Sequence, residues 1–276
     1  MRNKISRAVR YILHGVQPKY ITANVTVSSS GSKLNAKKVI ITGGGRGLGY
    51  YIAKKCIAEG ADVIIVGRNE ETLKKSAEDL NCKYLCFDVS DIAGIHDFFN
   101  KCEKLFGDTA DCLVNNAGIS LHENDIYHVT EETWDKQFNV NLKAPYFLSK
   151  EFVDRIERSH KTSASIIFMT SERGLYCDDI PYGLIKAAIN SLTQGLGRRL
   201  LSRNIRVNAV APGVTASDMT GYSKDGNLNR AAACSGRVYL PEEVAEVAAF
   251  LLSDESGCIS SHIVPCNNGN HLRCDW

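Results

Sequence analysis

Tyr182 and Lys186 are the residues whose types and spacing most directly suggest chemistry. In a helix, side chains four positions apart share one face, so a phenol and an ammonium would be neighbours. A phenol with its ordinary pKa of about 10 is a poor acid or base at neutral pH, but a nearby positive charge stabilises the phenolate and lowers that pKa. The pair is therefore a candidate general acid/base. The same spacing also occurs where the ring packs and the lysine is solvated.

A glycine-rich segment provides the context for that pair. Residues 38–42 form a short apolar run typical of a strand, residues 43–49 read Gly-Gly-Gly-Arg-Gly-Leu-Gly, and an amphipathic segment follows. Glycines let the backbone turn sharply and approach a pyrophosphate, and the free N–H groups of a helix start attract negative charge. The pattern predicts a dinucleotide-binding turn, although its spacing differs from Gly-x-Gly-x-x-Gly. A tight turn without a ligand is the alternative.

Several motifs in chain order resemble the short-chain dehydrogenase/reductase family over residues 37–270. They are the turn from Thr42 to Gly49, Asn115-Asn-Ala-Gly118, Asn141, Ser171 with Tyr182 and Lys186, and Pro212-Gly213. The resemblance implies hydride transfer between a nicotinamide and a carbonyl or alcohol carbon, with the cofactor supplying the hydride chemistry. It also implies that such a chain assembles as a homotetramer or homodimer through helices near 131–158 and 181–202.

The same resemblance assigns roles to four catalytic residues. In the reductive direction Tyr182 would donate the proton and Ser171 would hold the carbonyl oxygen. Lys186 would bind the nicotinamide ribose and lower the Tyr182 pKa, and Asn141 would hold a water. Taken singly, Ser171 could be an ordinary strand-end hydroxyl, and Asn141 a polar helix residue bonded to the backbone.

NADP(H) is the expected cofactor because the end of the second strand carries Gly67 where NAD enzymes use an acid. Arg68 and Arg46 could grip a 2′-phosphate, although single arginines are usually solvated surface charges. Asp88 resembles an adenine contact, or is a helix cap. The full set of expected cofactor residues is Thr42, Gly43, Gly45, Arg46, Gly47, Leu48, Gly49, Arg68, Asp88, Val89, Asn115, Ala117, Gly118, Tyr182, Lys186, Pro212, Gly213, Val214 and Ser217.

The elements that must position these residues alternate along the chain. Strand-like runs fall at 38–42, 62–66, 83–86, 111–114, 164–169, 205–210 and 259–265, and helices are expected at 47–58, 70–80, 91–104, 131–158, 181–202 and 241–252. The alternation predicts an α/β fold, a Rossmann-type doubly wound sheet of about seven parallel strands. With 276 residues and 44% hydrophobic content, residues 37–276 suffice for one domain.

Residues 1–36 form a basic N-terminal extension. The first 38 residues hold no acid and eight basic residues, namely Arg2, Lys4, Arg7, Arg10, Lys19, Lys33, Lys37 and Lys38. Ile5, Val9, Ile12, Leu13 and Val16 fall on one helical stripe. We favour an arm packed on a neighbouring subunit over contact with a membrane surface, and an organelle transit peptide stays open.

Other classes of function have little support in the sequence. The ten cysteines are scattered without a Cys-x-x-Cys motif, which favours reduced thiols and a cytoplasmic setting. The seven histidines lack metal-ligand spacing, so no metal is assigned. Nucleic-acid binding is not expected either, because the basic residues lack interleaved aromatics outside the N-terminal extension.

Departures from the family pattern bear on the substrate. Ten residues lie between Ser171 and Tyr182, about two fewer than in typical members of the family, which suggests a tighter loop over the substrate and, with the charged pair after Ser171, a sugar or polyol. Glu172 and Arg173 follow the serine, Asn267-Asn-Gly-Asn270 replaces Asp-Gly-Gly, and residues 218–236 resemble a mobile lid or a plain exposed loop. The charged pair indicates a polar substrate or, with more weight, an ion pair. We therefore expect an NADPH-dependent reductase similar to 3-oxoacyl-acyl-carrier-protein reductases, acting on a small or carrier-bound carbonyl. A sugar or polyol ketone reductase and a silent dinucleotide sensor are the alternatives.

Overall fold

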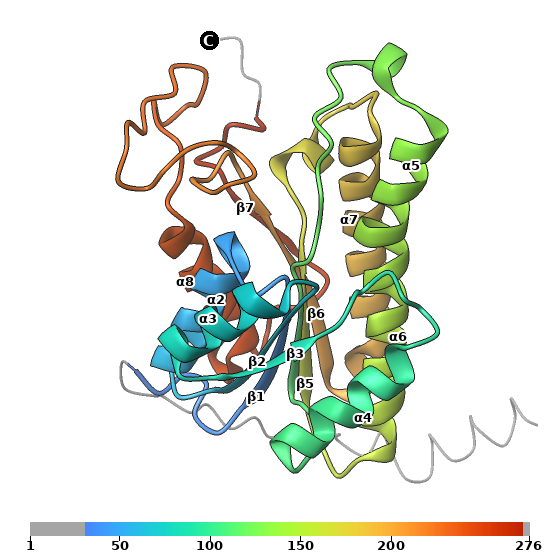
Figure 1. Ribbon diagram of the computed structural model, residues 1–276. Coiled ribbons are helices and arrows are strands. Elements are labelled where there is room, and N and C mark those ends of the chain that lie inside the picture. The colour runs from blue at the N-terminus through green and yellow to red at the C-terminus, as the bar shows by residue number, and fades with distance from the viewer. Residues whose placement is uncertain (1–30, 273–276) are drawn as a thin grey trace, which may run out of the picture.

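Seven parallel strands form one sheet in the computed structural model, which describes residues 31–272 (Figure 1). Their order across the sheet is β3-β2-β1-β4-β5-β6-β7. The strands are β1 (Lys38–Thr42), β2 (Asp62–Gly67), β3 (Lys83–Cys86), β4 (Cys112–Asn115), β5 (Ala164–Met169), β6 (Ile205–Pro212) and β7 (Ile263–Cys266). The predicted single-domain, doubly wound fold is confirmed.

The strand order reverses between β1 and β4. Ile40 pairs with Leu113 and Ile41 with Val114, so these two strands end side by side. Ligands of open parallel sheets bind in the crevice at the carboxyl ends of the strands, where the order reverses. The glycine turn after β1 and the Asn-Asn-Ala-Gly segment that starts at the end of β4 therefore share one edge of the sheet.

Helices cover both faces of the sheet (Figure 1). One layer contains α2 (Gly47–Ala58), α3 (Glu70–Leu80) and α8 (Pro241–Leu252), and the other contains α4 (Ile95–Phe106), α5 (Glu131–Phe138), α6 (Ala144–Arg158) and α7 (Pro181–Leu200). Short helical turns complete the elements: η1 (Ile126–His128), η2 (Asn139–Lys143), η3 (Glu172–Leu175), η4 (Leu201–Arg203) and η5 (Asp254–Ser256).

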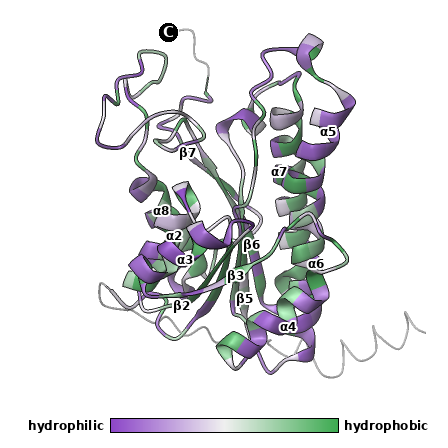
Figure 2. Ribbon diagram, viewed as in Figure 1, coloured by the Kyte–Doolittle hydropathy of each residue, from purple (hydrophilic) through white to green (hydrophobic). Residues whose placement is uncertain are grey.

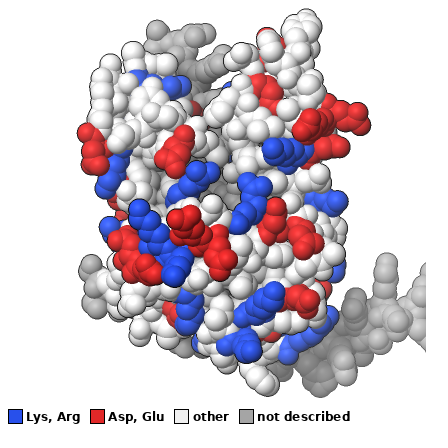
Figure 3. Space-filling model, in the orientation of Figure 1, with Lys and Arg blue, Asp and Glu red and all other residues white. Residues whose placement is uncertain are grey.

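The core has two halves because side chains along a strand alternate between its faces. Ile40 belongs to the cluster formed with α4, α6 and α7, whereas Ile41 belongs to the cluster formed with α2 and α8. Strands covered on both faces read as continuous apolar runs, and Figure 2 shows them as a hydrophobic layer between helices whose outer surfaces are mixed. On the face drawn in Figure 3, basic and acidic side chains are intermingled.

The structure corrects several predicted boundaries. The helix expected over 131–158 is divided by η2, a π-helical turn between α5 and α6. The helix expected from 91 begins at Ile95, and the strand expected from 259 begins at Ile263. Leu34 is fully buried in the core, so the packed unit begins before the predicted boundary at residue 37. The stripe from Ile5 to Val16 lies outside the described residues.

No helix within residues 31–272 is long and apolar enough to cross a membrane.

Candidate active site

Ser171 and Tyr182 meet at the carboxyl end of β5. Ser171 follows β5 by two residues, and its hydroxyl accepts a hydrogen bond from the Arg173 N–H at 3.2 Å, which starts η3. Tyr182 is the second residue of α7, directly after Pro181 at the helix start. The Ser171 hydroxyl lies close enough to the Tyr182 hydroxyl to lower the pKa of Tyr182. The expected serine and tyrosine therefore face each other.

Lys186 lies one helical turn further along α7. Its side chain is buried, and Nζ donates to the carbonyl oxygen of Met169 at 2.8 Å. The same Nζ lies 5.4 Å from the centroid of the Tyr182 ring. Burial lowers the pKa of Lys186 to about 8 because the low-dielectric interior disfavours the ammonium. The lysine is thus placed between the end of the sheet and the phenol.

The pKa of Tyr182 is raised, which corrects the prediction that Lys186 lowers it. Burial is the main cause, and it is opposed by the hydrogen bond from Ser171 and by the positive charge of Arg173. Lys186 directs its ammonium to the Met169 carbonyl instead. The charge that favours the phenolate comes from Arg173, for which the sequence alone does not indicate this role.

Asn141 occupies the π-helical turn η2, a rare geometry that is frequent at functional sites. Its amide donates to the Ile119 carbonyl at 2.7 Å and accepts from the Ile119 N–H at 2.8 Å. The turn also packs against α7. The Asn141 side chain is therefore bonded to the backbone, as the alternative interpretation of this residue predicted. Both bonds go to Ile119, so the side chain fixes the loop that follows Gly118.

The glycine turn has the geometry needed for a phosphate. Gly43 and Gly47 have positive φ angles of 66° and 54°, and a Cβ at Gly49 would lie 2.2 Å from the Gly43 carbonyl oxygen. No side chain caps the start of α2. Its first N–H groups are therefore available to an anion, and the helix dipole favours a negative charge there.

The side chain of Thr42 does not face the crevice, so a contact of this residue with a cofactor would come from its backbone. The side chain is buried, and its hydroxyl donates to the Val114 carbonyl at 3.2 Å and accepts from the N–H groups of Asn116 and Ala117 at 3.0 Å each. Asn116 returns two hydrogen bonds to the carbonyls of Thr42 and Gly43. Together they join the end of β1 to the segment after β4.

Two other expected cofactor residues also direct their side chains inward. Asn115 is buried and donates to the Ser149 hydroxyl at 3.0 Å. Val89 is buried in the core cluster of α4. Their contribution to a bound nucleotide would come from the backbone. By contrast, Gly45, Leu48, Ala117, Gly118 and Val214 remain partly accessible.

Arg46 and Arg68 are exposed on neighbouring parts of the surface. Cβ atoms at Gly45 and Gly67 would lie 3.3 and 3.4 Å from the same Leu73 methyl group. Because these glycines directly precede Arg46 and Arg68, the two arginines leave the backbone at neighbouring points. Arg46 lies 3.6 Å from Asp218, and Arg68 lies 3.8 Å from Asp88. Asp88 also accepts from Ser90 in a local cap.

The nicotinamide-side motif follows β6. Pro212 ends that strand, and the N–H of Gly213 donates to the Cys266 carbonyl at 3.0 Å. Ser217 is next to the glycine turn, since a Cβ at Gly47 would lie 3.9 Å from its Cβ. The structure thus brings the segment after β6, the glycine turn and the start of the 218–236 loop to one end of the sheet.

The charged residues after Ser171 are both paired inside the protein. Arg173 makes a bidentate ion pair with Asp178, at 2.5 and 2.6 Å. Glu172 is buried and accepts hydrogen bonds from Asn267 and Asn270. The expected ion pair is confirmed for the arginine, whereas the glutamate is held by neutral amides. Within residues 31–272, no cluster of three or more His, Cys, Asp or Glu side chains could hold a metal ion.

Comparison with known proteins agrees with this site. A family profile described as enoyl-(acyl carrier protein) reductase matches residues 43–271. A 3-oxoacyl-[acyl-carrier-protein] reductase of Chlamydia pneumoniae is 34% identical, covering 86% of this chain and 97% of the relative. A 3alpha-hydroxysteroid dehydrogenase of Mediterraneibacter gnavus is 33% identical, covering 84% and 95%.

A solved structure is similar as well. The short-chain dehydrogenase from Burkholderia cenocepacia, crystallised in complex with NADP, gives a TM-score of 0.78 at 28% identity, covering 87% of this chain and all of that one. The order of the motifs, the sheet topology and these likenesses agree. The chain belongs to the short-chain dehydrogenase/reductase family.

Proposed function

We propose that this protein is an NADPH-dependent reductase that converts a carbonyl to an alcohol, similar to 3-oxoacyl-acyl-carrier-protein reductases. The observation that carries the proposal is the contact between Ser171 and Tyr182 beside the buried Lys186, at the edge of the sheet that holds the glycine turn. The bound nicotinamide would supply the hydride.

The protonation states of the site support the reductive direction. Because the pKa of Tyr182 is raised, its phenol holds a proton at neutral pH and can donate it to the developing alkoxide. Ser171 would hold the same oxygen through its hydroxyl. Lys186, with a pKa of about 8, is mainly an ammonium at pH 7. The positive charge of Arg173 favours the phenolate that remains after proton transfer.

The residues present fit a nucleotide with a 2′-phosphate. The uncapped start of α2 suits the pyrophosphate. Arg46 and Arg68, exposed beside the carboxyl end of β2, suit the additional phosphate, and β2 itself ends in Gly67 rather than in an acid. We therefore propose NADP(H). A wild-type enzyme that turns over faster with NADH than with NADPH would contradict this assignment.

The substrate class rests on the relatives rather than on the charged pair after Ser171. Both Glu172 and Arg173 have partners inside the protein, so the charged pair, one of the two features that suggested a sugar or polyol, is accounted for without a polar substrate. We propose a β-ketoacyl thioester, free or carrier-bound. Two relatives, a 3-oxoacyl-[acyl-carrier-protein] reductase and a 3alpha-hydroxysteroid dehydrogenase, are named for acyl and steroid substrates, which are largely apolar.

NADPH oxidation against β-ketoacyl thioesters, ketosteroids and ketoses tests the function. The expected result is turnover of thioesters that Tyr182→Phe abolishes while nucleotide binding is retained, because the ring is kept and only the proton donor is lost. Preferred turnover of ketoses would support the sugar alternative. Tight NADPH binding without turnover of any compound would support the silent sensor.

We also propose that the chain forms a homotetramer or homodimer through α5, α6 and α7. An apolar groove of about 440 Å³ is lined by Phe138, Leu142, Tyr146, Phe147 and Leu192, among others. Large apolar side chains stay exposed on the same helices, including Trp134 and Leu184. Such a patch marks an interaction site. Tyr146→Asp should shift the mass measured by light scattering toward the monomer, and an unchanged mass would contradict this surface.

For the basic extension proposed at residues 1–36, whose last part packs on the domain at Leu34, a role at a subunit surface is favoured over membrane contact. A cytoplasmic setting is proposed as well. The nine cysteines within the described part of the chain are all free thiols, and thiols persist in reducing compartments.

A further inference from the structure

Glu172 is a buried carboxylate at the nicotinamide-side end of the site, and the proposed reaction gives it no role. Only 8% of the residue is exposed. Its Oε2 accepts from the Asn267 amide at 3.0 Å and from the Asn270 amide at 3.1 Å. A buried charge without hydrogen-bonding partners is strongly unfavourable. The two amide donors on one carboxylate oxygen therefore stabilise Glu172 in this position.

This carboxylate connects three segments that the site needs. Glu172 directly follows Ser171 and begins η3. Asn267 follows β7 and packs against the nicotinamide-side motif, since a Cβ at Gly213 would lie 3.0 Å from the Asn267 Cβ. Asn270 donates to Glu172 and accepts from the Cys234 N–H at 3.2 Å, within the 218–236 loop. One glutamate thus joins the serine, the segment after β6 and the loop proposed as a lid.

The other side of η3 is anchored on α7. A Cβ at Gly174 would lie 2.7 Å from the carbonyl carbon of Lys186, and Asn190 donates to the Gly174 carbonyl at 3.0 Å. With α7 on one side and the Asn267–Asn270 loop on the other, η3 has little freedom to move. The position of Ser171 relative to Tyr182 therefore depends on both anchors.

We propose that Glu172 is a positioning residue, whose bonds to Asn267 and Asn270 hold Ser171 in place and couple it to the 218–236 loop. The inference rests on the proposed reductase function. Correct placement of reacting groups contributes strongly to catalysis, and a misplacement of about 1 Å can lower a rate by about 100-fold.

The test uses variants that break and restore this contact. Glu172→Ala should lower kcat about 10- to 100-fold, with NADPH affinity nearly unchanged, because the glycine turn is untouched. Asn267→Asp should do the same by placing a second carboxylate against the first. The double variant E172Q/N267D exchanges donor and acceptor and should recover most of the lost kcat. Glu78→Ala, an exposed glutamate on α3, is the matched control.

Unchanged kcat in both single variants, or a double variant no better than Asn267→Asp alone, would overturn the proposal. Loss of stability without loss of kcat per folded molecule would also overturn it, because it would show a purely structural role.

Hydrogen exchange provides a readout that does not need turnover. The amides of Arg173 and Gly174 bond to Ser171, and both should exchange faster in Glu172→Ala than in Glu78→Ala. Equal exchange would refute the coupling. A wild-type protein without turnover would instead refute the proposed function and leave this measurement as the test of the inference.

Discussion

Replacing Lys186 with methionine should change how stability depends on pH. The folded pKa of Lys186 is about 8, compared with an ordinary value of 10.5. Between these values the unfolded chain holds a proton that the folded chain does not, so the free energy of unfolding rises with pH. At 1.36 kcal/mol per pKa unit, the rise that this lysine contributes between pH 7 and 9.5 is about 2 kcal/mol.

Urea unfolding at pH 7 and pH 9.5 measures this contribution. Wild type and Lys54→Met, a matched variant at an exposed position of α2, should both show the rise, and Lys186→Met should lack it. Buried thiols such as Cys112 act in the opposite direction, because burial raises their pKa, but they are common to all three proteins. The comparison therefore isolates the lysine.

The lysine should also limit stability at neutral pH, since a buried ammonium is less favourable there than in water. An equal pH dependence in Lys186→Met and Lys54→Met would refute the reasoning. It would mean that the interior around Lys186 solvates the ammonium as well as bulk water does.

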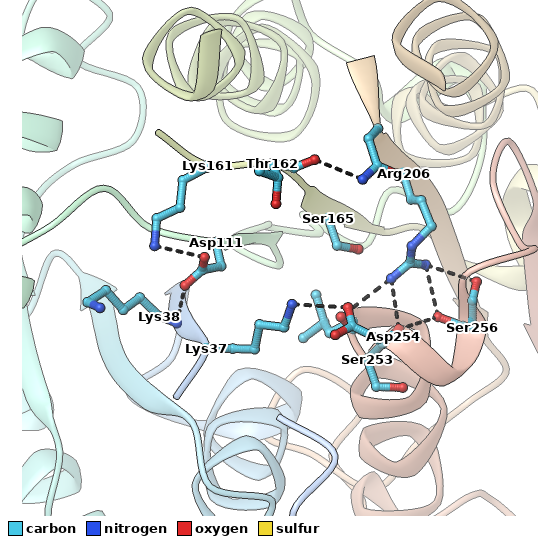
Figure 4. A network of polar contacts seen from close by, with 12 residues as sticks. Lys37, Lys38, Asp111, Lys161, Thr162, Ser165, Arg206, Ser253, Asp254 and Ser256 are labelled. Carbon is cyan, nitrogen blue, oxygen red and sulfur yellow. Dashed lines mark hydrogen bonds and ion pairs between the residues drawn. The ribbon is translucent and has the colours of Figure 1, made fainter. Parts of the chain in front are cut away.

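Three further predictions concern the turn, the cofactor and the sheet. Gly49→Ala should destabilise the fold by about 1 to 3 kcal/mol and abolish nucleotide binding, measured by urea unfolding and fluorescence titration, because its Cβ would overlap the Gly43 carbonyl oxygen. Arg46→Ala and Arg68→Ala should each weaken NADPH binding while leaving NADH binding unchanged, and equal losses for both nucleotides would contradict the assignment. Arg206→Met should lower the free energy of unfolding by about 1 to 3 kcal/mol, because it leaves buried acceptors around the end of α8 without a donor. These acceptors include the Leu251 and Ser253 carbonyls and the Ser256 hydroxyl (Figure 4).

Local patterns predicted most of the architecture. A strand such as residues 62–66, or a helix start such as Pro241, can be predicted from the residues next to it in the sequence. Both predictions lie within one residue of the observed element. The glycine turn was also predictable, because its positive φ angles demand glycine whatever surrounds it.

Contacts between distant residues could not be predicted in the same way. Glu172 and Asn267 are 95 positions apart, and neither position alone indicates its partner. Thr42 was expected to contact the cofactor, but its hydroxyl bonds to backbone groups near residue 115 that only the folded sheet brings close. The π-helical turn at Asn141 likewise depends on tertiary contacts, since residues 131–158 have a helical pattern throughout.

The order of the strands leaves β3 and β7 at the two margins of the sheet, where unpaired backbone groups could recruit another chain into a continuous ribbon. Both edge strands are only four residues long. β3 carries Lys83 in an ion pair with Asp62, and β7 carries Pro265, which has no N–H to offer. These features protect the protein from edge-to-edge aggregation, so we expect its assembly to proceed through side chains on its helices.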